Sequence, residues 1–526
     1  MLKLEELKKL GIKVPNFDLD DLSKNTYNNP TWLHFGAGNI FRAYIARLDQ
    51  DLLNKNLNDK GIIIALGYDY EMKELLFDPY DNKTISASLK ANGQIDFEYI
   101  CSITEALKAD YTYEDDMERI IEIFRNPSLQ MVTYTITEKG YVIKDNNGNY
   151  RKDVLEDLKN GYKYPISYMG KMAFFLYQRY LNNKLPLAMV SMDNCSKNGT
   201  VLKTSIMEIV KYWTDNNLVD KDFYNYVNDE KKISFPWTMI DKITPRPSSL
   251  VQDKLKELGL KDLNITTTSN KTFIAPFVNS EEKEYLVIED RFPNGRPKLE
   301  EVGVYFADRE TVDKVEKMKV TTCLNPLHTF LAIYGCLLDY HLIYDMMKNE
   351  TIYKLVTKLG YQEGLPVVVD PKIINPKQFI DEVINDRLLN PFMPDSPQRI
   401  ATDTSQKLPI RFGITIKSYL ERNISLDKLV VIPLVFAGWI RYLTGINDNL
   451  EKFELSPDPL LHEFNNLKFE TNKEIKLNDI EFILRRKDIF EHDLIEIGLD
   501  KKILYYLNEM NKGKDSIKNL LKTLTL

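Results

Sequence analysis

The first half of the chain alternates short, mostly apolar runs with segments of helical periodicity, and this alternation constrains the fold more than any other feature. After the first run, apolar residues recur at i, i+3 and i+4 across residues 41–52. Strands without polar alternation, each followed by a helix, are typical of a parallel sheet covered on both faces. The predicted strands are residues 31–35, 61–67, 130–137 and 187–192.

Small or polar residues follow three of these strands. Gly36-Ala-Gly38 comes after the first strand, Thr137-Glu138 closes the third, and Asp193-Asn194 follows the fourth. Because ligands of open α/β sheets lie beyond the carboxyl ends of the strands, we expect these groups to converge on one ligand site.

The two glycines suit the pyrophosphate of a dinucleotide. They permit a tight turn and close backbone approach, and the helix that follows offers free N–H donors. Phe41 stands where a third glycine of GxGxxG would be, so a plain tight turn is the alternative. The two glycines are therefore only weak evidence of dinucleotide binding.

An acid after the second strand bears on the choice of cofactor. Asp69, or Glu71 beside it, is placed to accept hydrogen bonds from ribose hydroxyls, and a carboxylate there favours NAD over NADP. An ordinary strand-end acid is the alternative. The candidate cofactor-binding residues are Gly36, Gly38, Asn39, Phe41, Asp69, Thr137 and Glu138.

The second half of the chain changes character. Residues 262–307 mix short strand-like runs with turns, and from about residue 309 the pattern becomes helical. We predict two domains, a Rossmann-like NAD-binding domain over residues 1–308 and a mostly α-helical substrate and catalytic domain over residues 309–526. The cleft between two such domains is the expected substrate site. Predicted helical segments include residues 329–340, 429–443 and 478–485.

Composition excludes several classes of function. A net charge of −7 gives no support for nucleic-acid binding. The longest apolar run, residues 429–440, is too short to span a bilayer. Four scattered cysteines and five dispersed histidines show neither a disulfide framework nor the spacing of metal ligands. We expect a cytoplasmic, metal-independent protein that acts on a small molecule, with its oligomeric state left open.

The stretch from Lys319 to His328 gathers an amine, an amide and an imidazole where a helix is predicted to begin. Asn325 is expected as the N-cap and Pro326 as the first helical residue. Such groups can take a proton from an alcohol and hold the oxyanion that forms. The alternative is a helix start with a solvated lysine and a structural histidine.

Seven segments carry a resemblance to a known family: residues 36–43, 135–141, 191–199, 239–245, 287–297, 319–328 and 399–407. In this order they resemble the mannitol dehydrogenase family of polyol-specific long-chain dehydrogenases. That family includes mannitol 2-dehydrogenases, fructuronate (mannonate) reductases and tagaturonate reductases. The resemblance implies an NAD-binding α/β domain followed by a mostly helical domain.

The resemblance also implies roles for individual residues. Lys319 is similar to the family's general base, Asn194 and Asn325 to the two amides that hold the reacting oxygen, and His328 to a substrate-orienting histidine. Asp241, Arg399 and Lys407 match substrate contacts, and Glu316 matches an acid that relays the proton to solvent. As alternatives, Asn194 is a strand-end turn residue, Asp241 is a structural cap, Arg399 pairs with Asp395 or Asp403, Lys407 is plain surface, and Glu316 is a solvated acid without a role.

One departure from the family pattern concerns the catalytic stretch. Five residues separate Lys319 from Asn325, where the family commonly has four. In one continuous helix the extra residue would turn Lys319 by about 100°. An insertion that bulges before Pro326 would leave the lysine in place, and Lys317 is a distant rival for the role.

The sequence therefore predicts an NAD-dependent oxidoreductase that interconverts a keto-sugar acid and its hydroxy form, of the D-fructuronate/D-mannonate type. Hydride transfer would use a lysine general acid/base and no metal. The alternatives are a mannitol 2-dehydrogenase, a tagaturonate reductase and, outside enzymes, a nucleotide-binding regulator.

Overall fold

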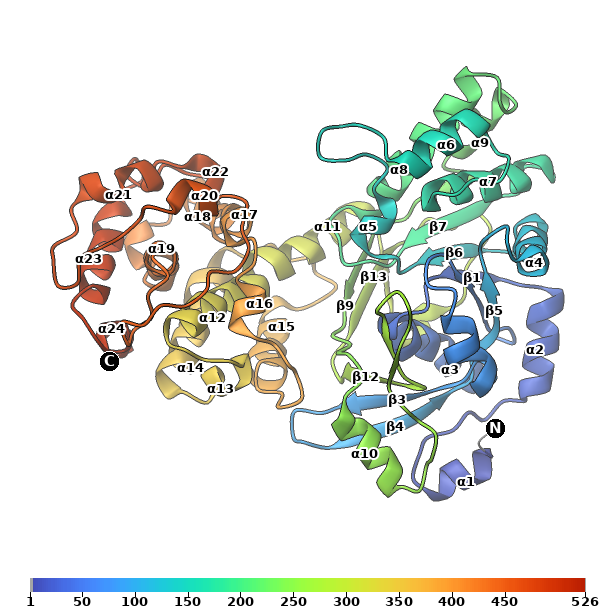
Figure 1. Cartoon of the computed structure of the whole chain (residues 1–526), viewed down its shortest axis with the longest axis horizontal. Helices are drawn as coiled ribbons and strands as arrows, with labels where there is room; N and C mark the ends of the chain where they lie inside the picture. The colour runs from blue at the N-terminus through green and yellow to red at the C-terminus, as the bar shows by residue number, and fades with distance from the viewer. Residues whose placement is uncertain (1–2, 526) are drawn as a thin grey trace. The chain divides into compact units, whose positions relative to one another are not determined.

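The computed structural model describes residues 3–525 and forms two compact units. The first comprises residues 1–90 and 94–313, and the second comprises residues 91–93 and 314–526. Strands belong to the first unit, whereas the second is built from helices (Figure 1). The predicted fold class, a Rossmann-like domain followed by a mostly helical one, is confirmed.

The core of the first unit is a six-stranded sheet in which every neighbouring pair is parallel. Counted along the chain, its members stand in the order 3-2-1-4-5-6, which is the dinucleotide-binding arrangement. All four predicted strands are present, as β1, β2, β6 and β7. In spatial order the strands are β5 (Ile103–Lys108), β2 (Ile62–Leu66), β1 (Trp32–Phe35), β6 (Met131–Tyr134), β7 (Leu187–Ser191) and β8 (Ile233–Ser234).

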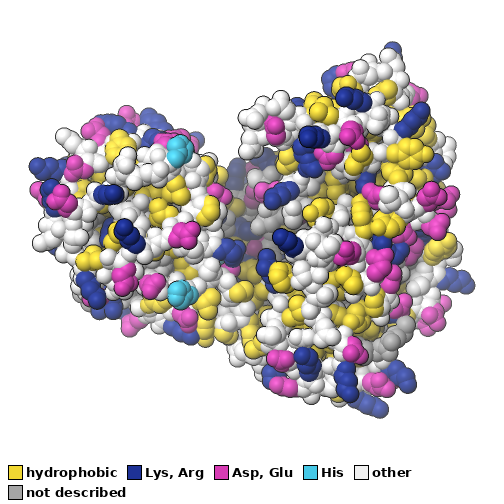
Figure 2. Space-filling model, in the orientation of Figure 1, with side chains coloured by type: hydrophobic (Ala, Val, Ile, Leu, Met, Phe, Trp, Pro, Cys, Tyr) yellow, Lys and Arg dark blue, Asp and Glu magenta, His cyan; other side chains and the backbone are white. Residues whose placement is uncertain are grey.

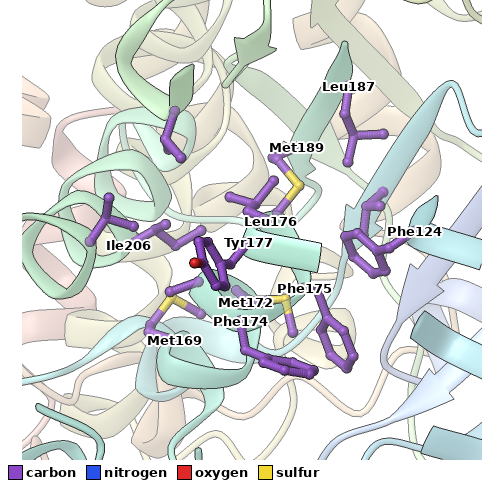
Figure 3. Packing of buried hydrophobic residues seen from close by; sticks show 14 of the residues in the cluster. Phe124, Met169, Met172, Phe174, Phe175, Leu176, Tyr177, Leu187, Met189 and Ile206 are labelled. Atoms are coloured by element: carbon purple, nitrogen blue, oxygen red, sulfur yellow. The ribbon is translucent and has the colours of Figure 1, made fainter. Parts of the chain in front are cut away.

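Both faces of this sheet are buried, which explains why its strands are mostly apolar on both sides. Leu33 and Val132 point to the face covered by α4 (Glu114–Arg125), α7 (Tyr168–Leu181) and α8 (Asn198–Asp215). Their neighbours Trp32 and Met131 belong to the core on the opposite face, with α3 (Ala46–Asn54). Figure 3 shows the first of these cores, where aromatic and Met side chains of α7 interdigitate with Phe124 of α4 and residues of β7.

Three smaller sheets complete the first unit, and five of their strands come from the predicted mixed segment after residue 262. One sheet has the order β12-β3-β4 and another β14-β13-β9, while β10 and β11 form a hairpin. Their bounds are β3 (Thr84–Leu89), β4 (Ile95–Ile100), β9 (Thr238–Asp241), β10 (Thr266–Thr267), β11 (Phe273–Ile274), β12 (Phe277–Glu281), β13 (Tyr285–Glu289) and β14 (Tyr305–Ala307).

The remaining helices of the first unit are mostly short. The helix predicted across residues 41–52 is present, with a π-helical first turn, η1 (Phe41–Ile45), before α3. The others are α1 (Leu4–Lys9), α2 (Leu19–Asn28), η2 (Lys73–Phe77), η3 (Asp78–Tyr80), α5 (Thr137–Tyr141), α6 (Lys152–Asn160), α9 (Asp222–Asn228), α10 (Ser249–Glu257) and η4 (Leu299–Val302); α11 (Arg309–Met318) then leads into the second unit.

The second unit consists mainly of helices and their connections, and the three predicted helical segments correspond to α12, α19 and α21. Its elements are η5 (Lys319–Cys323), α12 (Asn325–Leu337), α13 (Ile343–Met347), α14 (Glu350–Thr357), η6 (Lys358–Gly364), η7 (Leu365–Val367), α15 (Pro376–Glu382), η8 (Val383–Arg387), α16 (Pro397–Ile400), α17 (Thr404–Leu408), η9 (Pro409–Gly413), α18 (Ile414–Glu421), η10 (Leu426–Lys428), α19 (Val431–Tyr442), α20 (Leu461–Phe464), α21 (Leu477–Leu484), α22 (Lys487–Phe490), α23 (Asp500–Met510) and α24 (Ser516–Thr523).

A buried carboxylate caps the N-terminus of α19, a helix in which every residue is buried. Glu363 accepts hydrogen bonds from the backbone N–H groups of Val430, Val431 and Ile432 at 2.7–2.8 Å. Burial raises the pKa of Glu363 above its ordinary value, although these three bonds act in the opposite direction. The carboxylate thus satisfies donors that a helix N-terminus leaves without intrahelical partners.

The surface shown in Figure 2 carries basic and acidic side chains interspersed on each unit. Within residues 3–525, no helix is long and apolar enough to cross a membrane. The same residues contain no group of three or more His, Cys, Asp or Glu side chains placed to hold a metal ion.

Candidate active site

The turn after β1 requires a glycine. Gly36 has φ +114°, and a Cβ there would lie 2.8 Å from Thr135 Oγ1 and closer still to the Thr135 carbonyl oxygen. Its N–H donates to the Ala65 carbonyl at 3.2 Å. The ends of β1, β2 and β6 therefore meet at a point where no side chain fits.

A carboxylate joins the ends of β6 and β7. Asp193 accepts from the N–H groups of Ile136 (2.9 Å) and Thr137 (3.0 Å) and from the Tyr141 hydroxyl (2.6 Å). Burial is the largest influence on this carboxyl and raises the pKa of Asp193. Thr137, at φ +63°, is thereby held in a conformation that non-glycine residues rarely adopt. Asp193 thus brings the ends of β6 and β7 together, and convergence of all the strand-end residues on one ligand site stays a prediction.

A cavity of about 670 Å³ opens over these strand ends. Of the candidate cofactor-binding residues, Gly36, Asp69 and Thr137 line it. Its other walls are largely apolar and come from the ends of β2 and β6, from the segment after α5, and from the start of α7. Representative apolar lining residues are Leu66, Ile136, Val142, Ile143, Val154 and Met169.

The other candidate cofactor residues do not line this cavity. Gly38 and Glu138 are exposed, and Asn39 is half-buried, donating to the Pro245 carbonyl at 3.2 Å and accepting from Arg42. Phe41 is fully buried. Its ring stacks on His34 with centroids 4.1 Å apart. This ring has no surface to offer a cofactor, so the prediction that Phe41 binds one is corrected: it is a packing residue.

The Asp69 carboxylate accepts hydrogen bonds from residues that lie far from it in the sequence. It is 6% exposed, and its Oδ2 accepts from the hydroxyls of Thr268 and Thr272, each at 2.6 Å. Its Oδ1 is buried without a partner among the residues that the structure describes. Glu71, the alternative acid, accepts instead from the backbone N–H of Ser269 at 2.9 Å. The two threonines lie about 200 residues from Asp69, so no local pattern pointed to them.

Asn194 and Asp241 extend from two strands that are tied together. Asn194 is exposed just after β7, and Asp241 is the last residue of β9 and is 6% exposed. The fully buried Asn198 side chain donates to the Asp193 carbonyl at 3.0 Å and to the Thr238 hydroxyl at 2.8 Å. The end of β7 and the start of β9 are thus fixed to each other.

In the second unit, the stretch from Lys319 to Asn325, predicted to be catalytic, begins with a π-helical turn at Lys319–Cys323. The N–H of Leu324 donates to the Lys319 carbonyl at 3.1 Å, which is the i to i+5 bond of a π-helix. A π-helical turn contains one residue more than an α-helical turn, so it can take up the inserted residue. Lys319 is 4% exposed, whereas Lys317, its rival for the role of base, is exposed.

The predicted helix start is wrong by one residue. Leu324 is the N-cap of α12, and Asn325 and Pro326 are its first two residues. The π-helical turn is the physical reason, since it leads directly into α12. His328 is half-buried in the first turn, where its N–H donates to the Leu324 carbonyl at 3.2 Å. Glu316 is half-buried one turn before Lys319.

The two cations that were expected to contact the substrate have different partners within the chain. Arg399 forms an ion pair with Asp395, and its side chain is 66% exposed, which matches the alternative kept for it. Lys407 donates to the carbonyls of Ile400 (3.0 Å) and Thr402. Burial, followed by the charge of Arg411, lowers the pKa of Lys407 to about 8. Lys407 is therefore no plain surface lysine.

Arg411 is a functional candidate that the sequence analysis missed. Its Nη1 donates to Thr329 Oγ1 at 2.7 Å and to the Asn325 carbonyl at 3.4 Å, so it touches the first turn of α12. Burial lowers the pKa of Arg411 to about 10. Its position four residues after Lys407, on the same helical face, was the available signal.

Comparison with protein families decides the family. The model described as the mannitol dehydrogenase Rossmann domain matches residues 30–301, and that described as the mannitol dehydrogenase C-terminal domain matches residues 311–510. The chain belongs to the mannitol dehydrogenase family. The resemblance inferred from the seven sequence segments is confirmed, and the chain is an oxidoreductase of this family.

Individual proteins similar to this chain include one sequence relative and two solved structures. The chain is 50% identical over 523 residues to a D-mannonate oxidoreductase of Thermotoga maritima, covering 98% of this chain and 96% of that protein. Among solved structures, a substrate-free D-sorbitol dehydrogenase matches with a TM-score of 0.82 at 23% identity, over 99% of this chain and all of that one. A Pseudomonas fluorescens mannitol 2-dehydrogenase, in a ternary complex with NAD and D-mannitol, matches with a TM-score of 0.69 at 23% identity, over 99% of each chain.

Proposed function

We propose that the protein is an NAD-dependent oxidoreductase that interconverts D-fructuronate and D-mannonate. The observation that carries this proposal is the 50% identity, over nearly the whole of both chains, to a protein named D-mannonate oxidoreductase. The Rossmann sheet and the cavity over its strand ends support the proposal that the cofactor is a dinucleotide. A cytoplasmic location remains a prediction.

The residues at the strand ends fit NAD. Gly36 leaves the end of β1 open to close backbone approach. The buried Asp69 Oδ1 lacks a partner among the described residues and suits a ribose hydroxyl donor, whereas a 2′-phosphate there would meet a carboxylate. Gly36, Asp69 and Thr137 would hold the cofactor, with Gly38, Asn39 and Glu138 at its edge. When bound, NAD supplies the acceptor, and NADH the donor, of a hydride.

Side chains of this protein carry the proton and the developing charge. In oxidation, neutral Nζ of Lys319 accepts the proton of the substrate's secondary alcohol, and in reduction it returns that proton. The amides of Asn194 and Asn325 donate hydrogen bonds to the oxygen as it becomes anionic. His328 orients the same oxygen, and Glu316 passes the proton onward to solvent. No metal takes part in this scheme.

Substrate hydroxyl and carboxylate groups need partners of their own. In this proposal Asp241 accepts from a substrate hydroxyl, and Arg399 and Lys407 contact the end of the substrate away from the reacting carbon. Both cations suit an acid, but a neutral polyol also offers them acceptors. The choice between a sugar acid and a polyol therefore depends on further groups.

The test is a spectrophotometric assay at 340 nm with purified protein and NADH. We expect oxidation of NADH with D-fructuronate, a much slower rate with D-tagaturonate and D-fructose, and a lower kcat/KM with NADPH. Preference for fructose would indicate a mannitol 2-dehydrogenase, and preference for tagaturonate a tagaturonate reductase. Binding of NADH without turnover of any of the three would indicate a nucleotide-binding regulator and would refute the proposal.

A further inference from the structure

Two cations on consecutive helical turns of the second unit lack a carboxylate partner. Lys407 lies in α17 and Arg411 in η9, which follows without a break in helical backbone. Residues four apart in such a segment share one face. Across residues 3–525, no carboxylate lies within ion-pair distance of either side chain, whereas Arg399 nearby is paired with Asp395.

Both side chains have hydrogen-bond donors for which the described residues provide no acceptor. Lys407 uses two of the three donors of its ammonium group on backbone carbonyls. Arg411 uses only Nη1, on Asn325 and Thr329. Its Nε and Nη2 have no partner among the described residues, and they are not among the buried atoms closed off from solvent. An arginine edge of this kind is the usual partner of a carboxylate, because two parallel N–H donors match its two oxygens.

The local charge balance favours an anionic ligand. Placing two cations together in a partly desolvated site is costly unless an anion joins them. Asp403 and Asp458 lie near enough to favour the charged form of Lys407. The carboxylate of Asp458, however, is occupied by the N–H and hydroxyl of Ser405, and neither acid pairs with Lys407 or Arg411. The depressed pKa values of both cations agree with a positive site whose balancing charge comes from outside the chain.

We propose that Arg411 is a specificity-determining residue that, together with Lys407, binds the carboxylate of the substrate and makes the enzyme prefer sugar acids to neutral polyols and ketoses. This inference rests on the proposed function, because it assigns a partner to the group that distinguishes fructuronate from fructose. Arg411 contributes the bidentate edge, and Lys407 contributes a single donor and its charge.

A purely structural role for Arg411 makes a different prediction. Its bonds to Thr329 and to the Asn325 carbonyl hold the first turn of α12. If that were its whole function, loss of Arg411 would slow the reduction of acids and of neutral ketoses by the same factor. The ratio of kcat/KM for D-fructuronate to kcat/KM for D-fructose therefore separates the two roles.

The experiment compares wild type, Arg411→Met and Arg411→Lys with both substrates at saturating NADH. We expect Arg411→Met to lower kcat/KM for fructuronate by about 100-fold and to leave that for fructose within about threefold. Arg411→Lys, which keeps the charge but loses the paired donors, should lose about tenfold on fructuronate alone. Arg422→Met is the control, since Arg422 is another arginine of the second unit without a carboxylate partner among the described residues, and it donates to the backbone carbonyls of Pro366 and Val367.

Binding provides a second readout that does not need turnover. Calorimetric titration of D-mannonate and D-mannitol into enzyme saturated with NADH should show mannonate binding weakened in Arg411→Met and mannitol binding unchanged. Equal losses for acid and neutral compounds would overturn the inference while leaving the proposed function intact. A wild-type enzyme that reduces fructuronate no faster than fructose would overturn both. If Arg411→Met does not fold, Arg411→Lys alone decides, and an unchanged acid-to-neutral ratio in it refutes the inference.

Discussion

Replacing Gly36 with alanine tests whether the meeting point of β1 and β6 excludes a side chain. Alanine at φ +114° is strained, and this strain is about 1–3 kcal/mol. The new Cβ would also press on Thr135, whose N–H donates to the Phe35 carbonyl at 2.9 Å, while the Gly36 N–H donates to Ala65 at 3.2 Å. Weakening these two bonds costs about 0.5–1.5 kcal/mol each.

Together these terms predict that Gly36→Ala lowers the free energy of unfolding by about 2–6 kcal/mol. That is a large part of the stability of an ordinary domain, about 5–15 kcal/mol. Urea unfolding followed by tryptophan fluorescence measures the change, and NADH titration measures cofactor affinity, which should fall at least about tenfold because the strand ends move.

Gly38→Ala is the matched control for stability. A Cβ at Gly38 would meet no atom within 4 Å, and Gly38 is not in the left-handed region of φ. Its free energy of unfolding should therefore stay within about 1 kcal/mol of wild type. If Gly36→Ala unfolds at the wild-type urea concentration, or if both variants lose the same stability, the steric argument is refuted.

Three further predictions concern the second unit. Lys319→Ala should lower kcat by at least about a hundredfold and leave NADH binding, measured by fluorescence titration, unchanged; near-normal turnover would remove Lys319 from the role of base. Glu363→Ala leaves three donors at the start of α19 without their acceptor and should lower the free energy of unfolding by about 2–4 kcal/mol in a urea titration, with Glu363→Gln losing less; wild-type stability in both would show that water replaces the cap. Because the pKa of Lys407 is lowered to about 8, the native state binds fewer protons than the unfolded chain between about pH 8 and 10.5, so stability should rise with pH in that window. Over the same range Lys407 loses its charge, so KM for fructuronate should rise above about pH 8, and a rise of equal size in Lys407→Met would contradict this assignment.

Local patterns in the sequence were sufficient for the strands and for the cofactor turn. Residues 31–35 and 61–67 are mostly apolar without a regular polar alternation, which is typical of a parallel strand covered on both faces. Gly36 was singled out because it follows such a strand, and the structure shows the close approach that requires it. The family resemblance arose in the same way, from short segments in a fixed order.

The sequence was less informative where one side chain alone decided a role. Phe41, at the motif's third position, was read as a cofactor contact because of its place in the pattern, but burial against His34 makes it a core residue. The start of α12 was placed at Asn325 because asparagine is a good N-cap. In the structure Leu324 is the N-cap instead, because the π-helical turn at Lys319–Cys323 leads directly into α12. This turn is held by contacts such as the hydrogen bond from Thr415 Oγ1 to the Thr321 carbonyl at 2.9 Å.

Contacts between distant segments were decided only by the tertiary structure. The threonines that hold Asp69, the tie between Asn198 and Thr238, and the contact of Arg411 with the start of α12 each join residues 40 to about 200 positions apart. Hydrophobic periodicity records which face of an element is buried, because burial acts on each residue separately. A hydrogen bond between two elements depends on their packing, and a single sequence contains no period or spacing that encodes it.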